Sequence, residues 1–323
     1  MPVHAFVFPG QGSQSVGMGR DLAAAFPAAR EALEEVDDAL GQRLARLMFE
    51  GPADELMLTE NAQPALMAVS LAVLRVLERE GGFRLPDKAA LVAGHSLGEY
   101  SALAAAGALP LADTARLLRL RGQAMQRAVP PGEGAMAALL GAELDQARAL
   151  CEGAAVLVLE DGTEERQVVE PANDNGGGQV VISGAKAAVE RAMAQSRAQG
   201  IKRAALLPVS APFHCSLMRP AADAMREPLA GAPFRAPEVP LVANVTAERT
   251  QDPDEIRRLL VEQVTGLVRW RESVLACAAV GVDSFVELGA GKVLAGLVRR
   301  ILPDAAAVSV GSPAEVEAVL KQL

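Results

Sequence analysis

Short apolar segments alternate with longer helix-forming segments along most of the chain, and this alternation constrains the fold more than any other feature. Strands are predicted at 5–8, 91–93, 135–140, 180–183, 204–209, 241–244 and 284–288. Apolar residues recur at the helical period between them, in segments that include 21–40, 63–80 and 111–127. Apolar strands separated by helices are typical of a parallel sheet covered on both faces. The sequence therefore predicts an α/β fold with a mostly parallel sheet.

One region follows a different order. After the turn-forming residues 130–134, the predicted elements are a strand, a helix, two strands, a helix and a strand, which is the ferredoxin-like pattern. We therefore expect residues 134–206 to form a small ferredoxin-like α+β domain. It is inserted into a large, hydrolase-like α/β domain made of residues 1–133 and 207–323. The polar run 159–167 is predicted to be an exposed hairpin or loop of the insert.

The composition argues against several classes of protein. Half of the 323 residues are hydrophobic, which allows a large core, and a net charge of −9 with 3% aromatic residues argues against nucleic-acid binding. The three cysteines form no CxxC pair, so we expect no disulfide framework, metal site or cofactor. No segment reaches the roughly 18 apolar residues that a membrane span needs, and residues 1–8 lack the basic region of a signal peptide. We expect a cytoplasmic monomer that does not contact membranes.

Ser96 lies in Gly94-His95-Ser96-Leu97-Gly98, which fits the G-x-S-x-G pattern. An apolar strand precedes it at 89–93, and a helix-forming segment rich in small residues follows at 97–108. This order of strand, sharp turn and helix is the nucleophile elbow. The helix N-terminus places backbone N–H groups beside the serine oxygen, where they suit a developing oxyanion. A glycine-rich turn with a capping serine is the alternative, but the context favours a catalytic Ser96.

A serine nucleophile needs a base, and the chain holds only three histidines. His4 lies on the first strand, and His95, next to the serine, is expected to point away from it. His214 follows Pro212 in a loop after the strand that leaves the insert, so His214 is the best candidate. No Asp or Glu between 96 and 214 occupies a strand end. We therefore expect another group, such as a backbone carbonyl, to orient the histidine.

Arg121 lies on the apolar face of the predicted helix 111–127. A buried guanidinium is costly unless it is paired, and no acid lies one turn away on this helix. Its partner must come from elsewhere in the fold or from a ligand, and arginine binds carboxylates with two hydrogen bonds. A long side chain that reaches the surface and an internal salt bridge are the alternatives.

A second glycine-rich turn, Gly10-Gln11-Gly12-Ser13-Gln14-Ser15, follows the first strand. It fits neither the dinucleotide-binding nor the P-loop pattern, which disfavours a nucleotide site. The turn is either a plain tight turn or the source of a second backbone N–H for an oxyanion.

Together these motifs resemble the malonyl-CoA:acyl carrier protein transacylases, the acyltransferase family of fatty acid and polyketide synthesis. The resemblance covers the whole chain in ordered blocks with matching spacing. The main blocks are FPGQGSQSVGMG at 8–19, NAQPAL at 61–66, GHSLGEYSAL at 94–103, RLRGQAMQ at 119–126, PANDN at 171–175, QVVISG at 179–184, LPVSAPFHCSLM at 207–218, VANVTA at 242–247, QVTGLVRW at 263–270 and ELGAGKVL at 287–294.

The resemblance implies transfer of malonyl from malonyl-CoA to acyl carrier protein through an ester on Ser96, with His214 as base and then acid. It implies that the backbone N–H groups of Gln11 and Leu97 bind the oxyanion, and that the backbone carbonyl of Gln263 orients the histidine. Arg121 would bind the free malonyl carboxylate. The resemblance also implies that other residues bind the substrate, namely Gln63, Met125, Asn173, Asn175, Arg203 and Phe213. The bulk of Phe213 resembles the version of this position that selects malonyl.

Other functions share the same motifs. A malonyl transferase of malonate decarboxylase and a stand-alone polyketide acyltransferase use the same chemistry. A serine hydrolase or thioesterase has the same elbow, but Arg121 and the missing third acid favour transfer of a charged acyl group. An acidic carrier protein is expected to dock on a basic patch, for which Lys202, Arg203, Arg299 and Arg300 are the candidates. The chain departs from the family mainly at Leu267, where many members have proline, and in its longer 159–167 loop.

Overall fold

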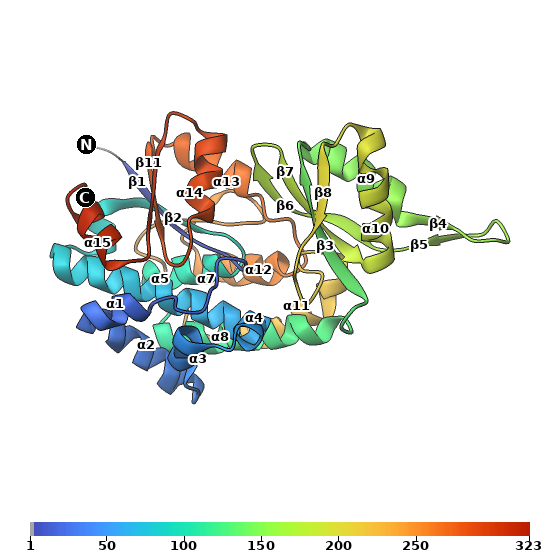
Figure 1. Cartoon of the computed structure of the whole chain (residues 1–323). Helices are drawn as coiled ribbons and strands as arrows, with labels where there is room; N and C mark the ends of the chain where they lie inside the picture. Colours follow the sequence, from blue (N-terminus) through green and yellow to red (C-terminus); the bar gives the residue numbers. More distant parts are fainter. Residues whose placement is uncertain (1–2) are drawn as a thin grey trace.

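A computed structural model describes residues 3–323, and residues 1 and 2 of the predicted large domain lie outside the described range. The described residues form two main sheets and a separate two-stranded hairpin (Figure 1). The six-stranded sheet, in the order β10-β9-β2-β1-β11-β12, contains β1 (His4–Phe8), β2 (Ala89–Gly94), β9 (Leu241–Val242), β10 (Arg249–Thr250), β11 (Ser284–Leu288) and β12 (Ala306–Val310). All its neighbouring strands are parallel except β9 and β10, so the predicted parallel sheet is confirmed.

The helices outside the 134–206 region surround this sheet in Figure 1. They are α1 (Arg20–Ala25), α2 (Pro27–Leu40), α3 (Leu44–Glu50), α4 (Ala53–Met57), α5 (Thr59–Gly81), α6 (Leu85–Lys88), α7 (Leu97–Ala105), α8 (Leu111–Ala128), α11 (Arg219–Gly231), α12 (Pro253–Gln263), α13 (Trp270–Ala278), α14 (Val293–Ile301) and α15 (Pro313–Leu320), with a short 3-10 turn, η2 (Ser216–Met218).

The second sheet is antiparallel and its strands all lie within 134–206. Its elements are β3 (Gly134–Leu140), α9 (Leu144–Ala155), β6 (Val169–Gly176), β7 (Gln179–Ala185), α10 (Lys186–Gln195), η1 (Ser196–Gln199) and β8 (Arg203–Leu206). Their order in the sheet, β6-β7-β3-β8, is that of a ferredoxin-like unit. A separate hairpin, β4 (Val156–Val158) with β5 (Glu164–Arg166), projects away from the body of the molecule (Figure 1). The polar run predicted to be exposed forms the tip and second strand of this hairpin.

Some predictions of local structure were incomplete, and the strand predicted at 204–209 ends at Leu206. The helix predicted at 21–40 is two helices, because Phe26 is extended and Pro27, which lacks an N–H, begins α2. Strand β12 was missed because it is an edge strand that is only partly buried, which weakens its apolar pattern. The strand predicted at 241–244 ends at Val242, which leaves Asn244 for another role.

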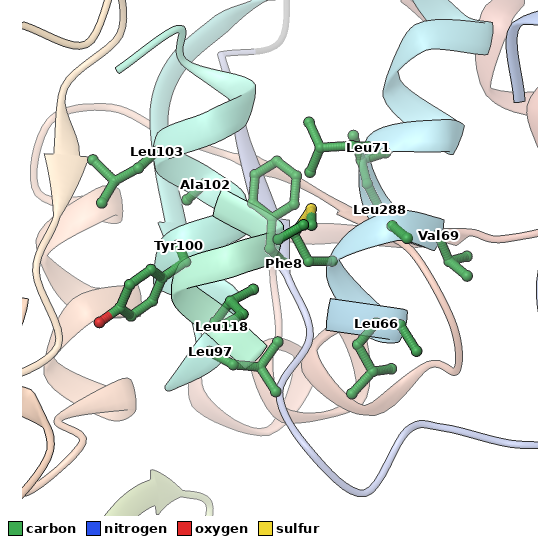
Figure 2. Close-up of a cluster of buried hydrophobic side chains, with 14 of the residues drawn as sticks. Phe8, Leu66, Val69, Leu71, Leu97, Tyr100, Ala102, Leu103, Leu118 and Leu288 are labelled. Atoms are coloured by element: carbon green, nitrogen blue, oxygen red, sulfur yellow. The ribbon is translucent and has the colours of Figure 1, made fainter. Parts of the chain in front are cut away.

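The larger core lies where β1 meets α5, α7 and α8. Figure 2 shows Phe8 of β1 between Leu71 of α5 and Leu103 of α7, and all three side chains are buried. The smaller core of the 134–206 region is built almost only from Ala, Val, Leu and Ile. Packing on both faces of β1 and β2 fixes the carboxyl ends of these strands, where the loops after them begin.

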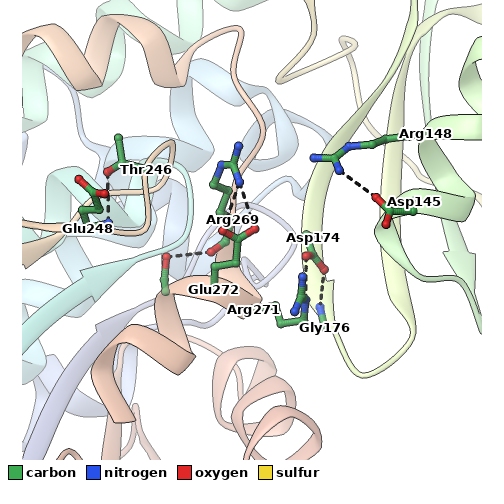
Figure 3. Close-up of polar contacts among 10 residues, drawn as sticks. Asp145, Arg148, Asp174, Gly176, Thr246, Glu248, Arg269, Arg271 and Glu272 are labelled. Atoms are coloured by element: carbon green, nitrogen blue, oxygen red, sulfur yellow. Dashed lines mark hydrogen bonds and ion pairs between the residues drawn. The ribbon is translucent and has the colours of Figure 1, made fainter. Parts of the chain in front are cut away.

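Strand β6 of the small sheet packs against α13 and the segment that precedes it. Asn173 forms an isolated parallel bridge with Val268, and the backbone N–H of Asp174 donates to the Val268 carbonyl at 2.9 Å. The nearly buried carboxylate of Asp174 pairs with Arg271 of α13 at 2.9 Å (Figure 3). These contacts join β6 to α13 and to the segment before it, outside the 134–206 region.

Candidate active site

Ser96 occupies a strained turn between β2 and α7. Its backbone has φ 55° and ψ −112°, a conformation that non-glycine residues rarely adopt. A Cβ atom at Gly94 would lie 1.9 Å from the Gly98 carbonyl oxygen, and one at Gly98 would lie 2.2 Å from the Phe8 oxygen. Both glycines are therefore needed for the turn to close against β1, and the structure has the predicted elbow.

Ser96 and His214 are in hydrogen-bond contact. The serine Oγ lies 2.7 Å from His214 Nε2, and His214 Nδ1 lies 2.9 Å from the backbone oxygen of Gln263. Because that carbonyl can only accept, Nδ1 carries the proton and Nε2 accepts from the serine. Burial and the neighbouring Arg121 guanidinium lower the pKa of His214 to about 3, so the imidazole is neutral and able to act as base.

The loop after β1 packs directly on the elbow. A Cβ atom at Gly10 would lie 2.7 Å from the His95 oxygen, so the backbones of the two turns approach closely. Gln11, in this loop, lines the same cavity as Ser96, and its side-chain oxygen accepts a hydrogen bond from Thr59 Oγ1 at 2.9 Å. Leu97 is the first residue of α7, where backbone N–H groups have no acceptor within the helix.

Arg121 is 1% exposed, as its position on the helix predicts. Its guanidinium donates to Gln63 Oε1 and Gln263 Oε1, both at 2.8 Å, and to Ser96 Oγ at 3.1 Å. The guanidinium carbon lies 5.6 Å from the centre of the Tyr100 ring. Among the described residues its hydrogen-bond partners are thus two side-chain amides and the hydroxyl of Ser96 rather than a carboxylate. The positive charge faces the serine with no direct ion pair, which suits an anionic ligand.

A cavity of about 340 Å³ contains this group. Of the predicted substrate-binding residues, Gln63, Met125, Asn173 and Phe213 line it. Asn175 instead binds His95, which lines the cavity, with 2.9 Å between Asn175 Oδ1 and His95 Nε2. Arg203 is exposed at the start of β8 and lies outside the lining.

Two buried polar residues that sequence reasoning missed complete the site. Asn244 Nδ2 donates to the Gly94 carbonyl at 2.6 Å, and its Oδ1 accepts from the Ser96 backbone N–H at 2.8 Å, so Asn244 braces the strained turn. Glu99 Oε2 accepts from Gln263 Nε2 at 2.7 Å and from the Asn244 backbone N–H at 3.2 Å. A lone acid within the apolar segment LGEYSALAA of α7 is the signal that could have found Glu99.

Within residues 3–323, no group of three or more His, Cys, Asp or Glu side chains is placed to hold a metal ion. None of the helices in that range is long and apolar enough to cross a membrane.

Comparison with known proteins agrees with the site. The chain matches the model of the acyl transferase domain family over residues 5–317. It is 48% identical over 321 residues to the malonyl CoA-acyl carrier protein transacylase of Escherichia coli (strain K12), which covers 99% of this chain and 100% of that protein.

Solved structures are similar over the same length. The acyl-carrier-protein-S-malonyltransferase from Bartonella henselae has a TM-score of 0.93 and 55% identity, and 99% of each chain is covered. A malonyl-transacylase in complex with its type II PKS acyl-carrier protein has a TM-score of 0.92 and 43% identity, over 99% of this chain and 100% of that chain. A serine elbow, a histidine held by a backbone carbonyl and this likeness lead to one conclusion: the chain belongs to the acyl transferase family.

Proposed function

We propose that the protein transfers the malonyl group from malonyl-CoA to the phosphopantetheine thiol of acyl carrier protein, in the cytoplasm, to supply fatty acid synthesis. The names of its relatives support this substrate pair. The observation that carries the proposal is Arg121, whose buried guanidinium lies 3.1 Å from the nucleophile oxygen. An acyl group bound there needs a carboxylate close to its thioester, and malonyl has one.

The first half-reaction forms the ester. His214 Nε2 takes the proton of Ser96 Oγ as this oxygen attacks the thioester carbonyl carbon. The backbone N–H groups of Leu97 and Gln11 stabilise the negative charge on the carbonyl oxygen. The carbon–sulfur bond then breaks, and the imidazolium gives its proton to the leaving CoA sulfur. The Gln263 carbonyl, which accepts from Nδ1, stabilises the imidazolium in the place of an acid.

The second half-reaction reverses these roles. His214 accepts the proton of the carrier thiol, whose sulfur attacks the malonyl-Ser96 ester. When the tetrahedral intermediate collapses, the bond to Ser96 Oγ breaks and the imidazolium returns the proton to that oxygen. Arg121 holds the malonyl carboxylate throughout, so the acyl group keeps one orientation for both attacks.

The carrier docking patch is a second part of the proposal. Lys202 lies beside Gly141, whose backbone N–H bonds to the Gly178 carbonyl, and Arg300 lies beside Gly177. Lys202 and Arg300 are therefore on the same end of the small sheet, which supports a basic surface for an acidic carrier. Reversing both charges is expected to raise KM for the carrier and to weaken its salt dependence. An unchanged salt profile would rule this patch out.

The central test is direct observation of the acyl enzyme. After brief mixing with malonyl-CoA, mass spectrometry is expected to find one malonylated residue, Ser96, and none in Ser96→Ala. Carrier thiol is then expected to remove the malonyl group much faster than water does. Rapid loss to water would indicate a hydrolase, and acylation elsewhere would overturn the assignment of the nucleophile.

A polyketide carrier is the second candidate acceptor. The similar malonyl-transacylase solved with its type II PKS acyl-carrier protein favours it. Comparing kcat/KM for a fatty acid carrier and a polyketide carrier distinguishes the two.

A further inference from the structure

Glu99 is a buried carboxylate that the reaction described above does not use. It is 1% exposed, and it lies one helical turn after the nucleophile. Burial raises the pKa of Glu99 to about 7. Placing a carboxyl group in this buried position beside Ser96 therefore costs free energy of folding. Such a group is retained where it has a function or where its contacts fix a structure.

The contacts of Glu99 lead to Gln263. The Gln263 amide nitrogen donates to Glu99 Oε2 at 2.7 Å and to the Ser96 carbonyl at 2.9 Å. Its amide oxygen accepts from Arg121 at 2.8 Å. The side chain of Gln263 therefore links the acid at one end to the substrate-facing arginine at the other.

An amide can rotate by half a turn with almost no change of shape, so something must select its orientation. A flipped Gln263 would turn its NH₂ group towards the Arg121 donors and its oxygen towards the Glu99 carboxylate, and both contacts would be repulsive. Glu99 Oε2 accepts from two N–H groups, so it acts as an acceptor whether or not the other oxygen, Oε1, carries a proton. The acid thus selects one orientation in either protonation state.

We propose that Glu99 is a positioning residue that acts through Gln263: it holds the amide oxygen of Gln263 towards Arg121 and so keeps the guanidinium aligned for the carboxylate of the acyl group. This inference rests on the proposed function. It separates two duties of Gln263. The backbone carbonyl that binds His214 belongs to the last turn of α12, whereas only the side chain depends on Glu99.

That separation defines the test. Glu99→Met removes the acceptor at similar volume, and Glu99→Gln keeps an oxygen that can accept from Gln263. In Glu99→Met we expect kcat/KM for malonyl-CoA to fall about 5- to 150-fold, the range for leaving a buried partner unsatisfied, chiefly through KM. Acylation of Ser96 by acetyl-CoA, which does not need the guanidinium, is expected to change less than about 3-fold. Glu99→Gln is expected to restore most of the malonyl activity.

Gln263→Met is the second variant, because it removes the amide but keeps the backbone carbonyl. Its amide also donates to the Ser96 carbonyl, so we expect both reactions to slow, with a larger loss for malonyl than for acetyl. The double variant Glu99→Met/Gln263→Met leaves neither partner unsatisfied and is expected to lose no more malonyl activity than Gln263→Met alone, which tests Glu99 if Glu99→Met does not fold. Equal losses for malonyl and acetyl groups, or no loss, would mean that Glu99 is only structural and would overturn the inference. A wild-type enzyme that forms no malonyl ester would instead overturn the proposed function, and the inference with it.

Discussion

The regions around the two main sheets contribute unequally to the candidate active site. The part of the chain outside 134–206 supplies every group to which the proposed mechanism gives a chemical role: Ser96, His214, Arg121, the backbone carbonyl of Gln263, and the backbone N–H groups of Gln11 and Leu97. In the small sheet, Met136 and Asn173 line the cavity, and Asn175 contacts His95, the residue before Ser96. The core of this sheet is almost wholly apolar, and Asp174 and Asn175, which make polar contacts to the rest of the chain, lie on β6.

This difference shows which part of the molecule must hold its side chains in precise positions. Each group with a chemical role makes several hydrogen bonds to residues far away in the chain, so its position is fixed from more than one direction. The small sheet reaches the site through side chains of β3 and β6, and these line one side of the cavity. Changes in the large part should therefore alter the chemistry, and changes in the small part should alter stability or fit.

The largest expected effect is on the base. His214→Ala should slow malonyl transfer by roughly 10²–10⁴, the usual contribution of a positioned acid–base group. His95→Ala removes the other histidine of the site, whose ring bonds to Asn175, and should cost far less. Rates for both variants, with circular dichroism to verify folding, test the assignment. Equal losses in two folded variants would show that the base was wrongly chosen.

Arg121→Ala should reduce malonyl transfer by roughly 30- to several-thousand-fold, because losing one partner of a buried charged contact costs about 2–5 kcal/mol. Acetyl transfer should fall little or rise, since acetyl has no carboxylate for Arg121. The measurement is kcat/KM for malonyl-, methylmalonyl- and acetyl-CoA in both enzymes. Equal losses for malonyl and acetyl groups would mean that Arg121 only supports the fold.

Sequence reasoning found the parts of the site that leave a local pattern. The elbow requires glycines at fixed spacing, and the helical period alone places Arg121 on a buried face. Gln263 came from the family resemblance, because any residue can present a backbone carbonyl. Sequence reasoning did not single out Glu99, since its role depends on Asn244 and Gln263, which lie 145 and 164 positions away. Contacts at such separations follow from the folded chain and have no signature in one sequence.

The buried base should also make stability depend on pH. The pKa of His214 is lowered from 6.5 to about 3 on folding, so between these values the unfolded chain binds the extra proton. Stability is therefore full above pH 6.5 and is lost as the pH falls. At pH 5 the loss is about 2 kcal/mol, from 1.5 pH units at about 1.36 kcal/mol each. Denaturant unfolding at pH 5 and pH 8 gives the change in unfolding free energy between the two pH values. In His214→Ala this change should be about 2 kcal/mol smaller than in the wild type. An equal change in the two proteins would contradict the lowered pKa of His214.

Two ion pairs near the start of α13, Arg271–Asp174 and Arg269–Glu272, can be compared (Figure 3). Arg271→Ala leaves the Asp174 carboxylate buried without its cation and should lower the free energy of unfolding by about 1–3 kcal/mol. Arg269→Ala removes a partly exposed pair between the residue before α13 and Glu272 in its first turn, and should cost about 0.5 kcal/mol or less. Similar losses in the two variants would mean that the Arg271–Asp174 pair is no stronger than an ordinary surface contact.

The smallest effect is expected in the separate β4–β5 hairpin, which can be compared with the β6–β7 hairpin of the small sheet. Val158 is 64% exposed and the strands pair only with each other, so replacing 159–163 by Asn-Gly removes little buried surface. Unfolding free energy should change by about 0.5 kcal/mol or less and malonyl transfer should be unchanged.

The β6–β7 turn should behave in the opposite way. Gly177 has φ 57°, and a Cβ atom there would lie 2.7 Å from the Arg300 Cβ. Gly177→Val combines a left-handed backbone with this clash, so it should cost about 1–3 kcal/mol. Chemical denaturation of both variants makes the comparison. A stable Gly177→Val beside a destabilised hairpin deletion would show that the small sheet is anchored through β4–β5 rather than through its contact with α14.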